Sequence, residues 1–190
     1  MLIEDGSGSG RKAKVNASFR IETQSTTINE ERSANDLGDA YNINTGNISL
    51  TAAGTMIYVK NNEDRDLVIE TIVFAFGLGT QSDSGEITIV RNPTGGDLIS
   101  DATAVDQNAN RNFGSSKTLT VDAYKGKSGG TLTGGSNLAL IYLNQSQRAS
   151  VPINFVIPKG NSVGISIDPK LSSGSMKVYC ALLVHVKETT

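Results

Sequence analysis

The side chains best suited to acid–base or nucleophilic chemistry are scarce in this sequence. It contains one histidine, His185, and one cysteine, Cys180, among 190 residues. A hydrolase triad or a histidine-based metal centre needs an imidazole together with an orienting group or further ligands. A single cysteine also excludes an internal disulfide and a cysteine-based zinc cluster. Any chemistry must therefore depend on these two residues or on carboxylates.

Both residues fall in one segment, residues 176–186, in which alternate side chains are apolar. Such alternation is typical of a β-strand with one buried face. The apolar face comprises Met176, Val178, Cys180, Leu182, Val184 and Val186. Cys180 is therefore predicted to be a small buried residue rather than a reactive thiolate. His185 falls on the other face, so we expect it to face solvent or a partner and not to act as a base.

Two groups of acidic residues remain as candidates for chemistry: Glu63-Asp64-Arg65-Asp66, and Asp97 with Asp101. Glycosidases use two carboxyl groups, and calcium sites use clusters of oxygen ligands. Neither group has the spacing of a calcium loop, and Arg65 interrupts the first. Aspartates in turns commonly bond to their own backbone, and we interpret these residues in that way. We expect no enzyme activity, no metal and no cofactor.

Paired glycines occur at Gly77-Leu78-Gly79, Gly95-Gly96, Gly129-Gly130 and Gly134-Gly135. A phosphate-binding loop leads into the N-terminus of a helix, and no helical pattern follows any of these glycines. They are predicted to form turns between strands. Sugar-binding faces usually present tryptophan or clustered tyrosines, whereas this chain has no tryptophan and five scattered tyrosines.

A cluster of basic residues near the N-terminus is the candidate partner-binding site: Arg11, Lys12, Lys14 and Arg20. Two interpretations are open. The residues belong either to a solvated linker or to a segment that docks onto an acidic protein surface, where such charges steer and orient. The net charge of −2 and the pI of about 5.4 give no field that would hold a polyanion, so no nucleic-acid partner is expected.

The glycine- and serine-rich stretch 5–10 cannot bury enough apolar surface to fold alone. We therefore predict an extended N-terminal arm over residues 1–18 and a single domain over residues 19–190, which has an ordinary domain size. The longest apolar run, residues 180–184, is far shorter than the ~20 residues that cross a bilayer. No membrane or secretory segment is predicted.

From residue 19 onward, short alternating or apolar segments recur between turn residues, as in an all-β protein. The predicted strands are 19–23, 41–43, 48–50, 56–60, 67–76, 86–90, 119–121, 138–143, 151–157, 163–167 and 176–186. The most apolar segment, 67–76, is predicted to be central in its sheet. Pro152 places its strand at an edge or a bulge, and Asn44-Thr45-Gly46-Asn47 is predicted to be a turn.

Only residues 29–38 suggest a helix, of one or two turns and without an apolar face. Strands without βαβ alternation favour two packed antiparallel sheets. With 37% hydrophobic residues and no tryptophan, the core is expected to consist mainly of Val, Ile and Leu. Residues 97–136 read as long loops, which are common binding sites.

Two segments resemble known proteins. The opening Asp5-Gly6-Ser7-Gly8-Ser9-Gly10-Arg11-Lys12-Ala13-Lys14-Val15-Asn16, followed by Phe19-Arg20-Ile21 and by Tyr41-Asn42-Ile43-Asn44-Thr45-Gly46, resembles the start of virion structural proteins of tailed bacteriophages. The segment Phe155-Val156-Ile157-Pro158-Lys159-Gly160-Asn161-Ser162-Val163-Gly164-Ile165 is similar to turns in jelly-roll capsid-associated domains.

This resemblance implies a jelly-roll β-sandwich that serves as a capsid cement or decoration protein. Such a protein binds the major capsid protein or other virion proteins on the capsid surface, is commonly a homotrimer, and is made in the host cytoplasm. The alternatives are a neck, tail or fibre appendage domain that binds a receptor or glycan, and a divergent carboxylate-dependent hydrolase.

Overall fold

The computed structural model describes residues 29–77, 85–144 and 148–188 in full, together with the backbone of Ser84 and, before residue 29, that of three short strands. These are β1 (Leu2–Glu4), β2 (Lys12–Val15) and β3 (Ile21–Glu22), which form a three-stranded antiparallel sheet in that order. The segment predicted as an arm thus contains two strands, and β3 lies within the predicted strand 19–23 but pairs with β2. The predicted boundary at residue 18 lies outside the described residues.

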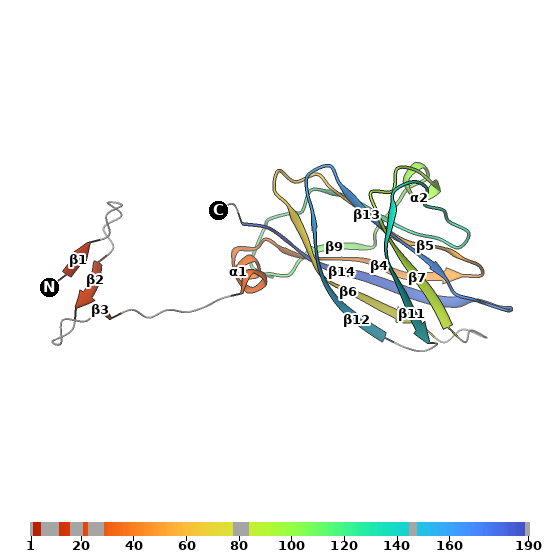
Figure 1. Cartoon of the computed structure of the whole chain (residues 1–190), viewed down its shortest axis with the longest axis horizontal. Helices are drawn as coiled ribbons and strands as arrows, with labels where there is room; N and C mark the ends of the chain where they lie inside the picture. Colours follow the sequence, from red (N-terminus) through yellow and green to blue (C-terminus); the bar gives the residue numbers. More distant parts are fainter. Residues whose placement is uncertain are drawn as a thin grey trace.

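The remaining elements form a β-sandwich with two short helices (Figure 1). They are α1 (Glu30–Leu37), β4 (Ala40–Leu50), β5 (Gly54–Asn61), β6 (Leu67–Phe76), β7 (Ser84–Arg91), α2 (Asp97–Ser100), β8 (Thr103–Ala104), β9 (Gln107–Asn110), β10 (Val121–Lys125), β11 (Ser136–Asn144), β12 (Arg148–Ile157), β13 (Ser162–Asp168) and β14 (Met176–Val186). Neither helix is long and apolar enough to cross a membrane.

One sheet has the strand order β12-β6-β14-β4-β9 and the other β11-β7-β13-β5-β10-β8. Every strand pair in them is antiparallel. The eight long strands, β4 to β7 and β11 to β14, can be numbered 1 to 8 along the chain. With the short strands β8, β9 and β10 left out, their order is 6-3-8-1 in the first sheet and 5-4-7-2 in the second. This is the double Greek key of a jelly roll. The predicted all-β, jelly-roll-like sandwich is confirmed.

The core lies between the two sheets and consists mainly of aliphatic side chains, as the composition predicted. Its largest fully buried members are Phe74, Ile43, Leu50, Met56, Ile57, Leu67, Ile69, Ile72, Ile87, Ile89, Ile165 and Met176. β6 has the predicted bounds and lies between β12 and β14. Pro152 lies on the edge strand β12, beside a register shift between Pro152 and Phe155, so both features predicted from this proline are present.

The prediction of a turn at residues 44–47 is wrong, because β4 continues through it as one strand. Tyr179 pairs with Asn47 and Ala181 with Asn44, so Thr45 and Gly46 form a bulge opposite Cys180. The buried Thr45 hydroxyl accepts a hydrogen bond from the Cys180 N–H at 3.1 Å and lies 3.2 Å from the Cys180 carbonyl oxygen. Gly46 has a φ of 61°, which glycine adopts without strain. The Thr45 hydroxyl thus bonds the backbone of Cys180, which has no paired residue on β4 at the bulge.

Helix α1 matches the predicted candidate at residues 29–38. The Asn29 side chain accepts a hydrogen bond from the Arg32 N–H at 2.8 Å, which is a standard N-cap. Gly38, with a φ of 75°, ends the helix in the left-handed conformation. Of the helix side chains, that of Ala34 is buried.

The stretch 97–136, predicted to be long loops, instead contributes strands to both sheets. β9 pairs with β4, and β10 pairs with β5. Of the predicted strand 119–121, only Val121 belongs to a strand, although Leu119 is also buried. This connection therefore adds strands to each sheet beyond the long strands β4 and β5.

Candidate functional site

The two sides of the sandwich differ in how their sheet edges end. On one side, β9 and β10 cover the edges of β4 and β5, and the outermost strands, β8 and β9, are only 2 and 4 residues long. On the other side the outermost strands are β11 and β12, with 9 and 10 residues. Within the described ranges, no strand pairs with their outer edges. We call β11 and β12 together the open edge.

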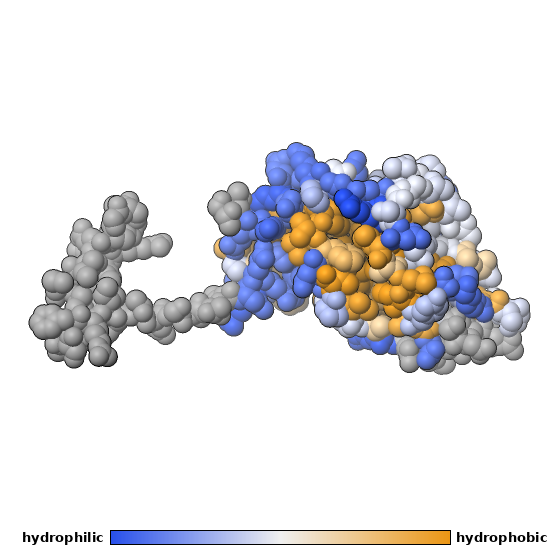
Figure 2. All heavy atoms as spheres, viewed as in Figure 1, coloured by the Kyte–Doolittle hydropathy of each residue, from blue (hydrophilic) through white to orange (hydrophobic). Residues whose placement is uncertain are grey.

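The open edge exposes apolar side chains. Leu140 is 49% exposed and Tyr142 is 65% exposed on β11, and Val156 is 50% exposed on β12. Side chains that point to the core from these strands, such as Ile141 and Ile153, are only partly buried. Figure 2 shows the result as an apolar surface across the middle of the sandwich, where Figure 1 places β11 and β12, with hydrophilic surface beside it.

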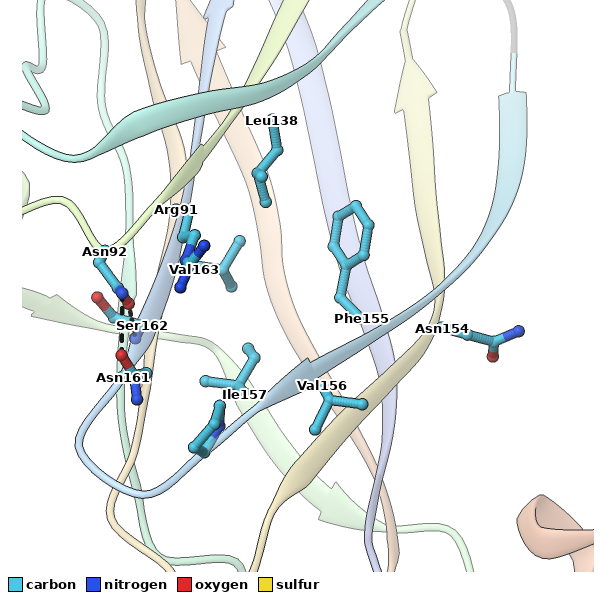
Figure 3. Close-up of a pocket in the computed structure, with 11 residues that line it drawn as sticks. Arg91, Asn92, Leu138, Asn154, Phe155, Val156, Ile157, Asn161, Ser162 and Val163 are labelled. Atoms are coloured by element: carbon cyan, nitrogen blue, oxygen red, sulfur yellow. Dashed lines mark hydrogen bonds between the residues drawn. The ribbon is translucent and has the colours of Figure 1, made fainter.

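A cleft of about 420 Å³ lies at one end of the open edge. Its lining is apolar at Leu138, Phe155, Val156, Ile157, Pro158 and Val163, and Arg91 adds a charged side chain from the end of β7. Leu138 is the unpaired bulge residue of β11, and Figure 3 shows its side chain directed into the same space as that of Phe155. The cleft is therefore suited to an inserted apolar side chain.

The polar rim of the cleft is held by internal hydrogen bonds. The Asn92 amide donates to Asn161 Oδ1 at 2.9 Å, and Asn92 Oδ1 accepts from the Ser162 N–H at 2.8 Å (Figure 3). These bonds link the end of β7 to the turn before β13. They fix this part of the rim, and Arg91 adds a charged group beside the apolar lining (Figure 3).

The open edge is almost uncharged. Between Ser136 and Ile157 the sequence has one charged residue, Arg148, in a chain where 19% of residues are charged. Exposed edge strands are normally protected by charges, by proline or by being short. Pro152 is the one such feature in these two long strands apart from Arg148. The open edge therefore lacks most of the features that protect an exposed edge strand.

The four basic residues predicted to bind a partner are only partly placed. Lys12 and Lys14 lie in β2, where the backbone of Lys14 pairs with Leu2 on one side and Glu22 on the other. Arg11 and Arg20 lie outside the described residues. Their role in docking stays a prediction.

The expectation that His185 faces solvent or a partner is wrong. Its side chain is 4% exposed, and its Nδ1 lies 2.7 Å from Glu70 Oε1. Its Nε2 lies 3.5 Å from Glu30 Oε1 on α1. The alternation along β14 does assign His185 to the outer face of the sheet, but α1 covers that face here.

Glu70 joins His185 to a second ion pair. Arg111 Nη1 donates to Glu70 Oε2 at 2.9 Å, and Arg111 Nη2 donates to Glu31 Oε1 at 2.7 Å. Burial lowers the pKa of His185, but the hydrogen bond to Glu70 and the negative charges of Glu70 and Glu30 outweigh it, so that pKa is raised. Burial raises the pKa of Glu70, but His185 and Arg111 outweigh it, so that pKa is lowered. The cluster thus favours the charged forms of both His185 and Glu70. Its contacts with Glu30 and Glu31 fix α1 to the sandwich.

The other candidates for chemistry are either buried or in contact with other residues of the chain. Cys180 is fully buried as predicted, and burial raises the pKa of its thiol. Lys127 Nζ lies 3.3 Å from Asp97 and 2.9 Å from Asp101, so a lysine occupies the space between these carboxylates. Asp64 pairs with Lys159. Across the described part of the chain, no group of three or more His, Cys, Asp or Glu side chains could hold a metal ion.

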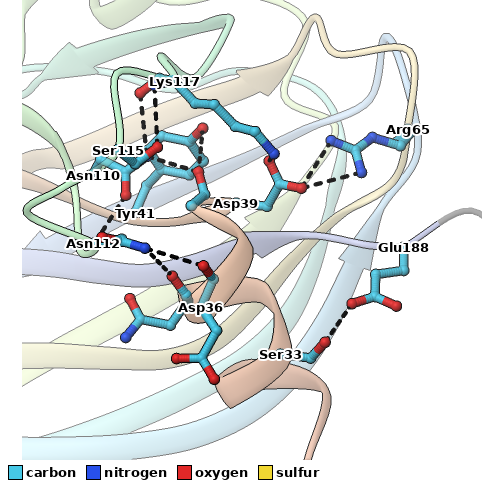
Figure 4. Close-up of polar contacts among 12 residues, drawn as sticks. Ser33, Asp36, Asp39, Tyr41, Arg65, Asn110, Asn112, Ser115, Lys117 and Glu188 are labelled. Carbon is cyan, nitrogen blue, oxygen red and sulfur yellow. Dashed lines mark hydrogen bonds and ion pairs between the residues drawn. The ribbon is translucent and has the colours of Figure 1, made fainter.

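One buried polar network had no signal in the sequence. Asp39 is 5% exposed and accepts from Lys117 Nζ at 3.0 Å, and it lies 3.4 Å from the guanidinium of Arg65 (Figure 4). The Asn110 amide donates to the Gly38 carbonyl at 2.7 Å, and that of Asn112 to the Asn35 carbonyl at 3.0 Å. These bonds join the end of α1 to the segment after β9, and they have no exposed reactive group.

Comparison with known proteins gives little further guidance. No protein-family model matches the sequence, and no curated protein matches it. A protein of Bacillus endospore appendages, described as disulfide-linked pili, aligns with 87% of this chain and 100% of its own length at 14% identity and a TM-score of 0.31. A chain of infectious bursal disease virus, strain Gt, aligns with 80% of this chain at 14% identity and a TM-score of 0.31, over 38% of its own length. TM-scores this far below 0.5 establish neither a common fold nor a common function.

Proposed function

We propose that this chain is a structural virion protein that binds the outside of a phage capsid and stabilises it, as a cement or decoration protein does. The observation that carries the proposal, as support for a chain that functions within an assembly, is the open edge, where two long, nearly uncharged strands expose apolar side chains. A surface of this kind is expected to be covered in an assembly. The resemblance of the N-terminal segment to tailed-phage virion proteins supplies the type of assembly.

The proposal includes no catalysis. His185 is engaged by Glu70 and covered by α1, and Cys180 is buried between the sheets. A nucleophile or a general base must reach a substrate. Cys180 is enclosed in the core, and His185, although it borders a surface cleft with Glu30 and Glu70, is 4% exposed and already bonded to Glu70. These positions support a binding role for the domain.

The proposed partner is the major capsid protein or another virion protein, and the proposed location is the capsid surface. In this proposal, residues 1–18 with Arg11, Lys12, Lys14 and Arg20 dock onto an acidic surface of the capsid. Several copies bound together would convert weak individual contacts into a stable association. A homotrimer is the proposed form.

Co-sedimentation of the purified chain with undecorated capsids tests this function. We expect the full chain to sediment with capsids, and deletion of residues 1–18 to reduce the bound fraction strongly. Replacing the four basic residues by glutamine is expected to weaken binding in a salt-dependent manner, because surface charge attraction is screened by salt. A full chain that stays in the supernatant at every concentration would refute the proposal. Binding to isolated tails but not to capsids would favour the appendage alternative.

A further inference from the structure

We infer that the open edge is the contact surface between copies of this chain, and that each copy inserts apolar side chains of β11 into the cleft of a second copy. The inference rests on the proposed function in that it assigns this surface to self-association and leaves the capsid to the N-terminal segment.

The open edge offers both halves of such a contact. Leu140 and Tyr142 project from β11, whereas the cleft between Leu138, Phe155 and Val163 is an apolar recess at the same edge. A surface that carries both a projection and a matching recess can associate with a copy of itself. The recess of about 420 Å³ exceeds the volume of one leucine or tyrosine side chain.

The polar groups of the open edge are also self-complementary. Asn137, Ser150 and Asn154 carry amides or hydroxyls, and these groups both donate and accept hydrogen bonds. A surface with many charges of one sign would repel its own copy, but here the charged residues are Arg148 of β12 and Arg91 at the cleft. A basic partner would find no acidic side chain on the two strands, and an acidic partner would find only these two arginines. A second copy therefore fits this surface better than a charged partner does.

The unpaired backbone of the edge strands adds a further contact. Each outermost strand presents a row of N–H and C=O groups on its free edge, and an antiparallel strand of a second chain can bond to that row. Strands of 9 and 10 residues extend about 30 Å at 3.3 Å per residue. The two sheets lie ~10 Å apart, and the outward-facing side chains of β11 widen the surface by about as much again. The surface area is therefore roughly 600 Å², near the ~800 Å² per partner of a stable interface.

Analytical ultracentrifugation of the full-length chain and of two matched variants tests the inference. Leu140→Lys places a charge on the open edge, and Phe113→Lys places the same charge on a fully exposed aromatic residue elsewhere. We expect the wild-type chain and Phe113→Lys to form the same oligomer. Leu140→Lys is expected to weaken association at least tenfold. Circular dichroism and unchanged melting temperatures would show that both variants are folded, as expected for substitutions at exposed positions.

Hydrogen exchange measured at low and high protein concentration provides a second test that needs no variant. We expect amides of β11 and β12 to become more protected at high concentration, whereas those of β8 and β9 do not change. A wild-type chain that is monomeric at every concentration would overturn the inference. Equal association of Leu140→Lys and Phe113→Lys would overturn it as well.

Capsid co-sedimentation of the same variants separates this inference from the proposed function. Loss of capsid binding by a Leu140→Lys variant that remains oligomeric would make the open edge the capsid contact, which overturns the inference and keeps the function. A monomeric Leu140→Lys variant with weakened but detectable capsid binding supports both. In a third outcome, the wild-type chain associates, Leu140→Lys abolishes that association, and neither chain binds capsids. This outcome supports the inference and refutes the function.

Discussion

His185 Nδ1 lies 2.7 Å from Glu70 Oε1, and both side chains are almost completely buried. The pair connects β14 to β6, and through Glu30 and through Arg111 with Glu31 it connects both strands to α1. Because α1 is the first described element after the N-terminal strands, this cluster fixes the point at which the N-terminal segment joins the sandwich. The stability of that junction is expected to depend on pH.

The raised pKa of His185 gives the direction of this dependence. Its contribution to the free energy of unfolding is fully present below its ordinary pKa of 6.5 and is lost as the pH rises through the raised value. The lowered pKa of Glu70 acts at the other end: its contribution is present above its ordinary value of 4.5 and is lost as the pH falls through the lowered value. Both contributions are therefore complete between pH 4.5 and 6.5.

We expect urea unfolding of the wild-type chain to show a decrease in stability as the pH rises above 6.5. A His185→Gln variant is expected to be less stable at pH 6 and to lack most of this decrease. Because the chain has one histidine, its imidazole signal in an NMR titration reports the pKa without ambiguity. A pKa at or below 6.5 in the folded chain would contradict the prediction.

Removing the carboxylate of Glu70 is expected to be more damaging than removing an exposed charge. Glu70→Gln leaves the buried His185 without its ion-pair partner and leaves the partly exposed Arg111 with Glu31 alone. Breaking a buried ion pair such as that of His185 and Glu70 costs about 3 to 5 kcal/mol. The measurement is the urea midpoint at neutral pH. Arg32→Gln is the control, because Arg32 and Asp36 form an exposed pair at 3.9 Å and its loss should leave the midpoint unchanged. Equal effects of the two substitutions would show that the cluster does not stabilise the fold.

The bulge in β4 gives a prediction about a single hydroxyl group. Thr45→Val keeps the shape of the side chain but leaves the buried N–H of Cys180 without its acceptor, which is expected to cost about 1 to 3 kcal/mol. Thr45→Ser retains the hydroxyl and is expected to lose less stability. Chemical denaturation of the three chains measures the difference. A Thr45→Val variant as stable as Thr45→Ser would show that the hydroxyl is dispensable.

The correct and incorrect sequence predictions have physical causes. β6 and the edge position of Pro152 followed from local rules, since an apolar alternating segment and a proline each carry their own information. The face of His185 was also correct, but its burial depends on α1, which lies about 150 residues away in the sequence. The turn predicted at Thr45 failed because a hydroxyl bond to Cys180 keeps the strand continuous. Although Pro152 indicated an edge position for β12, the sequence could not predict that β11 ends the other sheet on the same side, because this depends on the order of all the strands in both sheets.

Cys180 provides the last prediction. The thiol is fully buried in the core, and burial raises its pKa. Since the thiolate is the reactive form, the folded chain is expected to react with a thiol reagent such as DTNB only at the rate at which the site opens. Full reaction of one thiol per chain is expected within minutes in denaturant. Rapid reaction of the folded chain would mean that the sandwich opens readily near β14, and a Thr45→Val variant that reacts faster than the wild-type chain would locate that opening at the bulge.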